Sequence, residues 1–130
     1  MKYTITILCL ILFSACTKAE DIEETQESYG IITGKVYGFD YNSGGVLIGE
    51  DYLGDQDVFI STKGTTNYFS KTKTAYDGAF TFENLDIGEY DIWVFGDCDY
   101  CVWDQRYFLV SVELASMDEV LIIDDIEITF

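Results

Sequence analysis

The pair of thiols at Cys98 and Cys101 is the pattern in this chain best suited to chemistry. A C-x-x-C spacing can close a disulfide, carry out thiol–disulfide exchange or supply two ligands to zinc. Exchange needs nearby cations or a helix N-terminus, whereas the neighbours here are Asp97, Asp99 and Asp104. Because the Cα atoms of the first and last residues of a β-turn lie within about 7 Å, a structural disulfide is the preferred interpretation. A thiol–disulfide protein is the alternative.

Carboxylates gather in two short stretches of the sequence. Such clusters are typical ligands of Ca²⁺, but neither stretch has EF-hand spacing. A chain with 24 acidic and 7 basic residues has acidic clusters wherever it faces water. We therefore predict a solvated acidic surface and no cofactor, and keep calcium as the weaker hypothesis. The two stretches are Asp97, Asp99 and Asp104, and Asp51, Asp55 and Asp57.

The composition excludes several kinds of functional site. The 130 residues include no His, so a Ser-His-Asp triad and a His-ligated zinc or haem cannot be built. A net charge of −17 repels phosphate backbones, so nucleic acid is not expected as a partner. Paired carboxylates for glycoside hydrolysis would need a cleft, and a small domain offers little. We therefore predict that the chain is not an enzyme.

Aromatic residues make up 16% of the chain, and they are more informative about binding than the acidic clusters. Exposed rings can stack on sugars or anchor protein partners. Tyr100 and Trp103 flank the C-x-x-C turn, and Tyr52 falls in a long glycine-rich segment, so these three are the candidate ligand-binding residues. Trp93 and Phe95 share one face of an expected strand. We interpret that face as covered by other parts of the chain, because a strand that is covered on both of its faces carries apolar residues on both.

The elements that must position these residues are strands. Residues on the two faces alternate along six stretches, as in half-buried antiparallel strands, and a seventh stretch is a weaker, polar strand. Turn signals at Asp77-Gly78, Ile87-Gly88 and residues 42–45 separate them, and the segment 39–56 is expected to be irregular. About seven strands in about 100 residues predict an all-β fold, a Greek-key β-sandwich. The stretches are 32–37, 57–61, 66–73 (a polar edge strand), 80–83, 90–95, 107–114 and 126–130.

The N-terminus has the pattern of a secreted lipoprotein. After the basic start, an apolar run of thirteen residues reaches Ala15, too short for a spanning helix and suited to a signal peptide. The sequence Phe13-Ser14-Ala15-Cys16 resembles a bacterial lipobox, in which the Cys is acylated. We therefore expect a signal peptide at 1–15, acylated Cys16 as a membrane anchor, an acidic disordered tether at 16–28 and a folded domain at 29–130.

One segment carries a family resemblance. Residues 72–94, TKTAYDGAFTFENLDIGEYDIWV, resemble the hallmark of carboxypeptidase regulatory-like domains, the transthyretin-like (prealbumin-like) sandwiches common in Bacteroidetes surface proteins. In that pattern Asp77-Gly78 closes a tight turn, Phe80 and Phe82 fill the core, and Leu85 plugs the end of the sandwich. The resemblance extends over roughly residues 30–130. It implies adhesion, spacing or carbohydrate association. Related hydrolases with this sandwich use His and Arg clusters, whereas Arg106 is the only Arg here.

Taken together, the sequence predicts a lipid-anchored protein of the bacterial cell envelope, an outer-membrane lipoprotein facing the periplasm or the cell surface. Its expected role is that of a non-catalytic binding, adhesion or spacer module with a glycan or protein partner. The alternatives are a carbohydrate-binding module that uses Tyr100, Trp103 and Tyr52, and a thiol–disulfide protein that uses Cys98 and Cys101.

Overall fold

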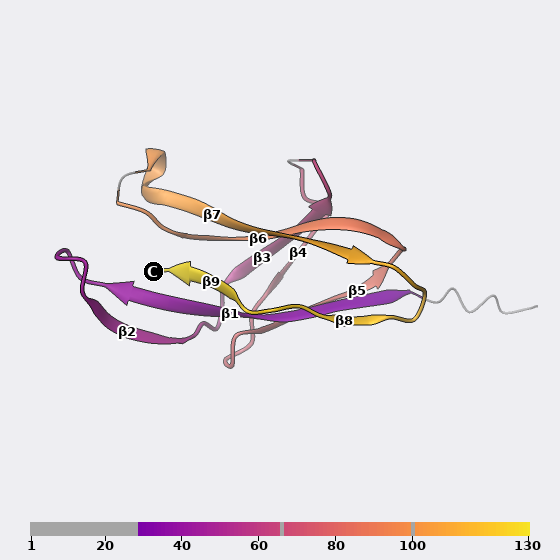
Figure 1. Ribbon diagram of the computed structural model, residues 1–130, viewed down its shortest axis with the longest axis horizontal. Coiled ribbons are helices and arrows are strands. Elements are labelled where there is room, and N and C mark those ends of the chain that lie inside the picture. The colour runs from indigo at the N-terminus through magenta and orange to yellow at the C-terminus, as the bar shows by residue number, and fades with distance from the viewer. Residues whose placement is uncertain (1–28, 66, 100) are drawn as a thin grey trace, which may run out of the picture.

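A computed structural model describes residues 29–65, 67–99 and 101–130, and these form two packed sheets with one short 3₁₀ helix, η1 (Val102–Asp104) (Figure 1). The first sheet has five strands: β1 (Gly30–Tyr41), β2 (Leu47–Tyr52), β5 (Ala79–Leu85), β8 (Val120–Ile122) and β9 (Ile126–Thr129). The second has four, in the order β4 (Ser70–Lys73), β3 (Asp57–Thr62), β6 (Gly88–Asp97) and β7 (Gln105–Leu114). The predicted all-β sandwich is confirmed.

Strand β1 organises the five-stranded sheet. Its first half lies between β5, which is antiparallel to it, and β8, which is parallel. Its second half lies between antiparallel β2 and parallel β9. The predicted alternation holds along the strand, since every second residue from Gly30 to Gly38 is buried. The chain crosses between the sheets, so that β1 pairs with β5 and β3 with β6, as in Greek-key sandwiches.

The core lies between the two sheets. Thirteen apolar residues from both inner faces are buried, and a close approach of β6 and β9 helps to close them in. A Cβ added at Gly96 would stand 2.6 Å from the carbonyl oxygen of Thr129, so only glycine permits that approach. The buried set is Ile32, Val36, Val58, Ile60, Phe80, Phe82, Leu85, Tyr90, Ile92, Val94, Leu114, Ile126 and Ile128.

The expectation of an irregular segment at 39–56 was wrong. β1 continues to Tyr41, and β2 returns antiparallel beside it, so most of this segment is a hairpin. Its turn is the predicted glycine-rich cluster at 42–45. The Asn42 side-chain oxygen accepts hydrogen bonds from the backbone N–H groups of Gly44 and Val46, and Gly45 has a φ of 76°. With β8 also formed, the described residues contain nine strands, compared with about seven predicted.

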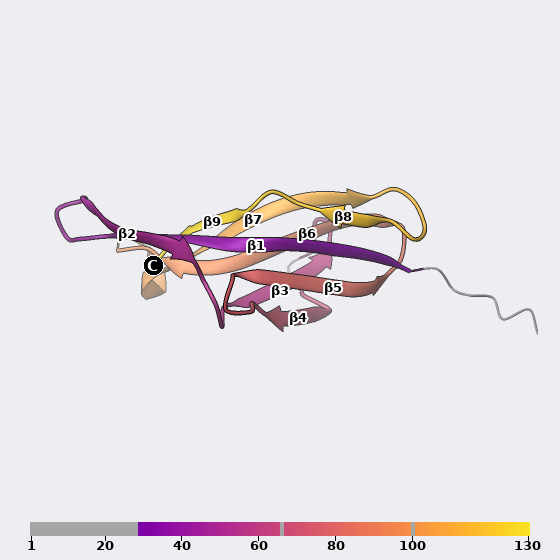
Figure 2. The same cartoon turned by 90° about the horizontal axis from the view of Figure 1, so that it is seen from below.

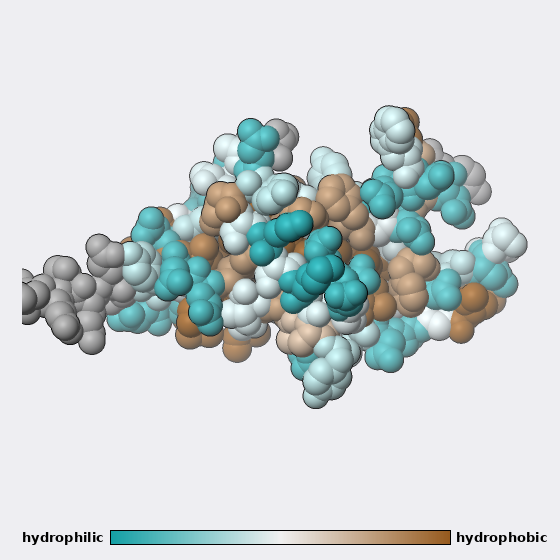
Figure 3. All heavy atoms as spheres, turned by 180° about the vertical axis from the view of Figure 1, so that it is seen from behind, coloured by the Kyte–Doolittle hydropathy of each residue, from teal (hydrophilic) through white to brown (hydrophobic). Residues whose placement is uncertain are grey.

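Polar residues form the edge of the four-stranded sheet at β4, as predicted. Lys71 and Lys73 lie on this four-residue strand, and Lys73 pairs with Asp57 at 3.3 Å. Charged side chains on a short edge strand discourage further pairing. β4 and β5 lie far from the viewer in Figure 1 and come forward in Figure 3, where hydrophilic side chains gather at the centre of the face.

The two ends of the sandwich differ. The β1–β2 turn and the β6–β7 loop lie together at one end, and β1 begins at the other (Figure 1). Figure 2 shows β1 running along the length of the molecule between them. Within the described ranges, no helix has the length and apolar character that crossing a membrane requires.

Candidate binding groove

The outer face of the four-stranded sheet carries a row of apolar side chains. Register places Phe59 of β3 opposite Trp93 of β6, and Trp93 opposite Leu109 of β7. In the next row, Phe95 lies opposite Tyr107. Because residues directly opposite in antiparallel strands share a face, these five side chains all project away from the core.

Ring contacts hold this face together. The rings of Phe59 and Trp93 are stacked, with centroids 5.7 Å apart and planes 13° apart. Tyr68 and Phe95 each stand edge-on to Phe59, at 4.9 and 5.6 Å. Edge-to-face and offset-stacked pairs each add about 0.5–1.5 kcal/mol beyond the area that they bury. The rings therefore form a fixed floor.

Above this floor lies an open groove of about 370 Å³ with mostly apolar walls. Trp93 is only 9% exposed, whereas Tyr107 is 61% and Phe95 43% exposed. Trp93 is buried, as expected, but it is shielded by neighbouring side chains on its own face. The expectation that a second layer covers this face was wrong, since Phe95 is exposed and no other part of the described chain lies over it. The groove is lined by Phe59, Thr65, Tyr68, Trp93, Phe95, Tyr107 and Leu109.

A buried carboxylate holds one wall of the groove. Asp91, 7% exposed, accepts a hydrogen bond from the Ser111 hydroxyl at 2.5 Å and one from the Gly64 backbone N–H at 3.0 Å. These two bonds hold the pKa of Asp91 below its usual range, against the opposing effect of burial. Ser61, in register with Asp91, donates to the Thr65 carbonyl oxygen at 3.1 Å. The loop that carries Tyr68 is therefore attached to the sheet.

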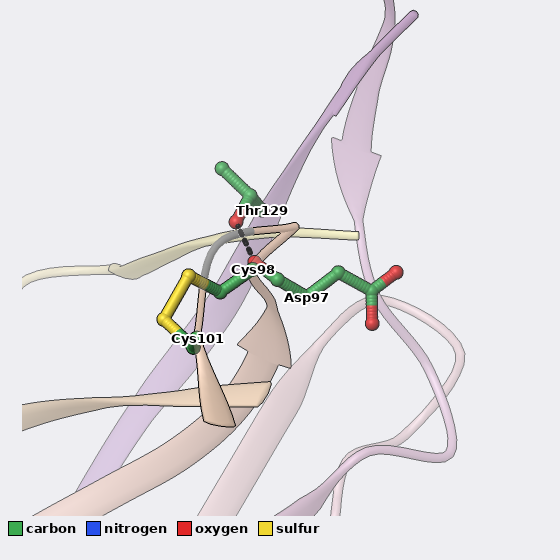
Figure 4. The surroundings of a disulfide bond; sticks show 4 residues. All are labelled: Asp97, Cys98, Cys101 and Thr129. Atoms are coloured by element: carbon green, nitrogen blue, oxygen red, sulfur yellow. Dashed lines mark hydrogen bonds between the residues drawn. A yellow bond between two sulfur atoms is a disulfide. The ribbon is translucent and has the colours of Figure 1, made fainter. Parts of the chain in front are cut away.

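The predicted disulfide between Cys98 and Cys101 is confirmed, with Cα atoms 5.4 Å apart (Figure 4). It spans the loop between β6 and β7. The Cys98 N–H donates to the carbonyl oxygen of Asp104 at 3.0 Å, and the Thr129 hydroxyl donates to that of Asp97 at 2.7 Å. The second bond joins this loop to β9 of the other sheet.

Two of the predicted ligand-binding residues, Trp103 and Tyr52, lie in different parts of the sandwich. Trp103 projects from the β6–β7 loop, 88% exposed and with a φ of 73°. Tyr52 lies on β2, in the other sheet, where its hydroxyl donates to Asp125 at 2.9 Å and its ring is edge-on to Tyr37. The hydrogen bond to Asp125 raises the pKa of Tyr52. Tyr100 lies outside the described residues, so its role stays a prediction.

The calcium candidates Asp97, Asp99 and Asp104 are not brought together. Across residues 29–65, 67–99 and 101–130, no three His, Cys, Asp or Glu side chains form a group suited to a metal ion. In the other acidic stretch, Asp55 and Asp57 share Lys73, at 3.6 and 3.3 Å.

The groove itself was not predicted from the sequence. The signal was present: Phe59, Trp93 and Leu109 each occupy the position of their strand where a polar residue was expected. A run of apolar residues on the outer face of three adjacent strands indicates either a further layer or a binding surface. The register that puts the three in one row depends on strand order, which the sequence does not show.

The sequence matches no family model and no curated protein. The solved structures that are similar in fold include the following three. A candidate carbohydrate-binding protein from Pseudomonas aeruginosa is 13% identical, with 76% of this chain and 90% of that one covered and a TM-score of 0.47. The major pilin subunit of Bacillus cereus is 10% identical (77% and 29% covered, TM-score 0.47), and a 9R-lipoxygenase from Cyanothece is 12% identical (80% and 17% covered, TM-score 0.42). A shared function does not follow at this similarity, and the resemblance to carboxypeptidase regulatory-like domains stays a prediction.

Proposed function

We propose that this chain is a lipid-anchored, non-catalytic binding module of the bacterial cell envelope, which receives an apolar or ring-bearing group of its partner in the aromatic groove. One observation carries the proposal: a groove of about 370 Å³ with mostly apolar walls opens on a sheet face that the described chain leaves uncovered. Ligand sites are typically concave, mostly apolar and about 300–1,000 Å³ in volume, with a few polar groups at fixed positions.

The groove also has the rigidity that binding favours. Stacked and edge-on rings fix its floor, and the bonds of Asp91 fix the loop behind Tyr68. A site that is already ordered loses less conformational entropy when a ligand arrives. Polar groups stand at its margin, since Lys71 is in register with Phe59 on β4 and Thr65 belongs to the lining.

The location is supported by the sequence alone. Residues 1–28, which contain the lipobox-like segment, Cys16 and the acidic tether, lie outside the described residues. An anchor at Cys16 would join the domain through Gly30, at the end of the sandwich opposite the β6–β7 loop (Figure 1). The carboxypeptidase regulatory-like resemblance, where it implies adhesion or spacing, agrees with this role.

Nuclear magnetic resonance of the full-length chain tests the groove. The probe is N-acetyl-phenylalaninamide, a neutral molecule with one aromatic ring. We expect its addition to shift the Trp93 indole N–H signal and the backbone signals of Tyr107 and Leu109, and Leu109→Lys to abolish these shifts. The matched control Leu47→Lys changes a similarly exposed leucine on β2 and should leave the shifts intact. Shifts confined to residues outside the groove would refute the proposal.

Glycan binding is the second candidate, and the exposure of Tyr107 favours it. A ring that is 61% exposed beside a groove offers a flat face on which a sugar can stack. The same spectra recorded with a glycan panel decide this point. Shifts at Tyr107 and Phe95 would support a sugar ligand, and unchanged spectra across the panel would discard it.

A further inference from the structure

Strand β7 leaves one backbone edge unpaired beside the groove. It is the terminal strand of the four-stranded sheet, ten residues long, and β6 is its only hydrogen-bonded neighbour among the described strands. Opposite β7, the sheet ends in the short, lysine-bearing β4. A long edge of free N–H and C=O groups is a template for a further strand.

The hydrogen-bond pattern identifies the free groups. In an antiparallel pair, alternate residues exchange hydrogen bonds with the partner strand. The bond from the Cys98 N–H to the Asp104 carbonyl oxygen, one step beyond the end of β7, fixes this alternation. Even-numbered residues of β7 therefore bond to β6, and the odd-numbered ones direct N–H and C=O toward the free edge. The central ones are Tyr107, Leu109 and Ser111.

The same residues connect this edge to the groove. The side chains of Tyr107 and Leu109 line the groove, while their backbone groups face the free edge. Side chains of a strand added beside β7 would alternate between the two faces of the sheet. Those on the outer face would stand next to Tyr107 and Leu109 and extend over the exposed rings.

Charge indicates the chemistry of such a strand. Asp97, Asp99 and Asp104 lie at one end of β7 and Glu113 at the other, and Arg106 is the only cation on the strand. The whole chain carries a net charge of −17. A second copy of this chain would bring the same negative charge, whereas lysines or arginines at both ends of an added segment would be attracted.

From these observations we infer that β7 pairs with an extended segment of a partner protein, apolar in alternate positions and basic at both ends. The segment completes the sheet through backbone hydrogen bonds and places apolar side chains in the groove, the mode of recognition known as β-augmentation. The inference rests on the proposed function, because it names the partner of the same groove.

The test is a binding titration of the full-length chain with synthetic peptides about as long as β7. The first peptide alternates Val and Tyr with Thr and has two lysines at each capped end. Two further peptides have the same side chains but carry N-methyl groups on alternate residues. In one peptide the N-methyl groups lie along one edge of the strand, and in the other they lie along the opposite edge. Because N-methylation removes backbone donors on one edge only, we expect one peptide to bind at least about tenfold more weakly and the other to bind as the parent does.

Variants of the chain separate the pairing from the groove. Leu109→Lys should weaken binding of the parent peptide by about tenfold or more, and Leu47→Lys should leave its affinity unchanged. Equal affinity of both N-methylated peptides, with Leu109→Lys still weakening binding, would overturn the β-strand pairing and leave the groove standing. No peptide binding, while N-acetyl-phenylalaninamide shifts the groove signals, would also overturn the inference alone. Self-association that the peptide competes away would make the occupant a second copy and overturn the inference as well.

Discussion

The indole ring of Trp93 lies parallel to the phenyl ring of Phe59, with centroids 5.7 Å and planes 13° apart, on the outside of the sandwich. Trp93 is nevertheless buried, at 9% exposed, because its neighbours on the same face enclose it. This side chain therefore has two roles. It stabilises the four-stranded sheet, and it forms the floor of the groove.

Removal of the buried indole should be costly. Trp93→Ala deletes a large side chain that is 9% exposed, so the free energy of unfolding should fall by about 3–5 kcal/mol. The matched control is Trp103→Ala, which deletes the same side chain where it is 88% exposed and should change that energy by less than about 0.5 kcal/mol. Urea unfolding of both variants checks this. Equal losses of unfolding free energy in the two variants would contradict the burial of Trp93.

Asp91 should make the stability depend on pH. Its pKa lies below the ordinary value in the folded chain, chiefly because Ser111 donates to it, so its contribution is present above about pH 4 and is lost as the pH falls through the lowered pKa. Asp91→Asn puts an amide N–H₂ where an acceptor is needed, and should cost about 1–3 kcal/mol at pH 7.

Urea unfolding at pH 7 and at pH 3 measures this contribution. The difference between the native chain and Asp91→Asn should be smaller at pH 3. Asp99→Asn, at an exposed position, should match the native chain at both values. If the difference in unfolding free energy between the native chain and Asp91→Asn were larger at pH 3 than at pH 7, a lowered pKa of Asp91 in the folded chain would be contradicted.

Reduction of the disulfide should have a local effect. Cys98 and Cys101 are three residues apart, so the closed loop is short and its entropic contribution is about 2 kcal/mol at most. We expect reductant to lower the unfolding temperature modestly and to leave ligand shifts in the groove unchanged. A reduction potential above about −300 mV would support the thiol–disulfide alternative, and a lower one would indicate a structural bond.

Membrane attachment should depend on Cys16. Replacement by Ala removes the only residue that the lipobox-like sequence offers for acylation, so Cys16→Ala should move the chain from the membrane fraction to the soluble fraction. Cys9→Ala, inside the expected signal peptide, is the control and should not change fractionation. Unchanged membrane attachment of Cys16→Ala would contradict a lipid anchor.

The sequence was informative wherever a local rule determines the structure. Alternation located the core strands, and Gly78, with a φ of 82°, forms the turn that Asp77-Gly78 predicted. The β1–β2 hairpin was missed because Gly44 and Gly45 were counted toward an irregular segment, whereas they make up only its turn. The groove was missed for a different reason. Period two shows which face Phe95 occupies, but only the packing of other elements decides whether that face is covered.

Site-specific photo-crosslinking on living cells tests the groove most directly. p-Benzoylphenylalanine replaces Tyr107, at the margin of the groove, or Tyr76, a tyrosine that is 94% exposed in the β4–β5 turn. We predict a covalent adduct of defined mass from position 107, lost when Leu109→Lys is added, and no such adduct from position 76. The same adducts from both positions, or none from position 107 in cells that retain the folded protein, would contradict the claim that this groove receives the partner.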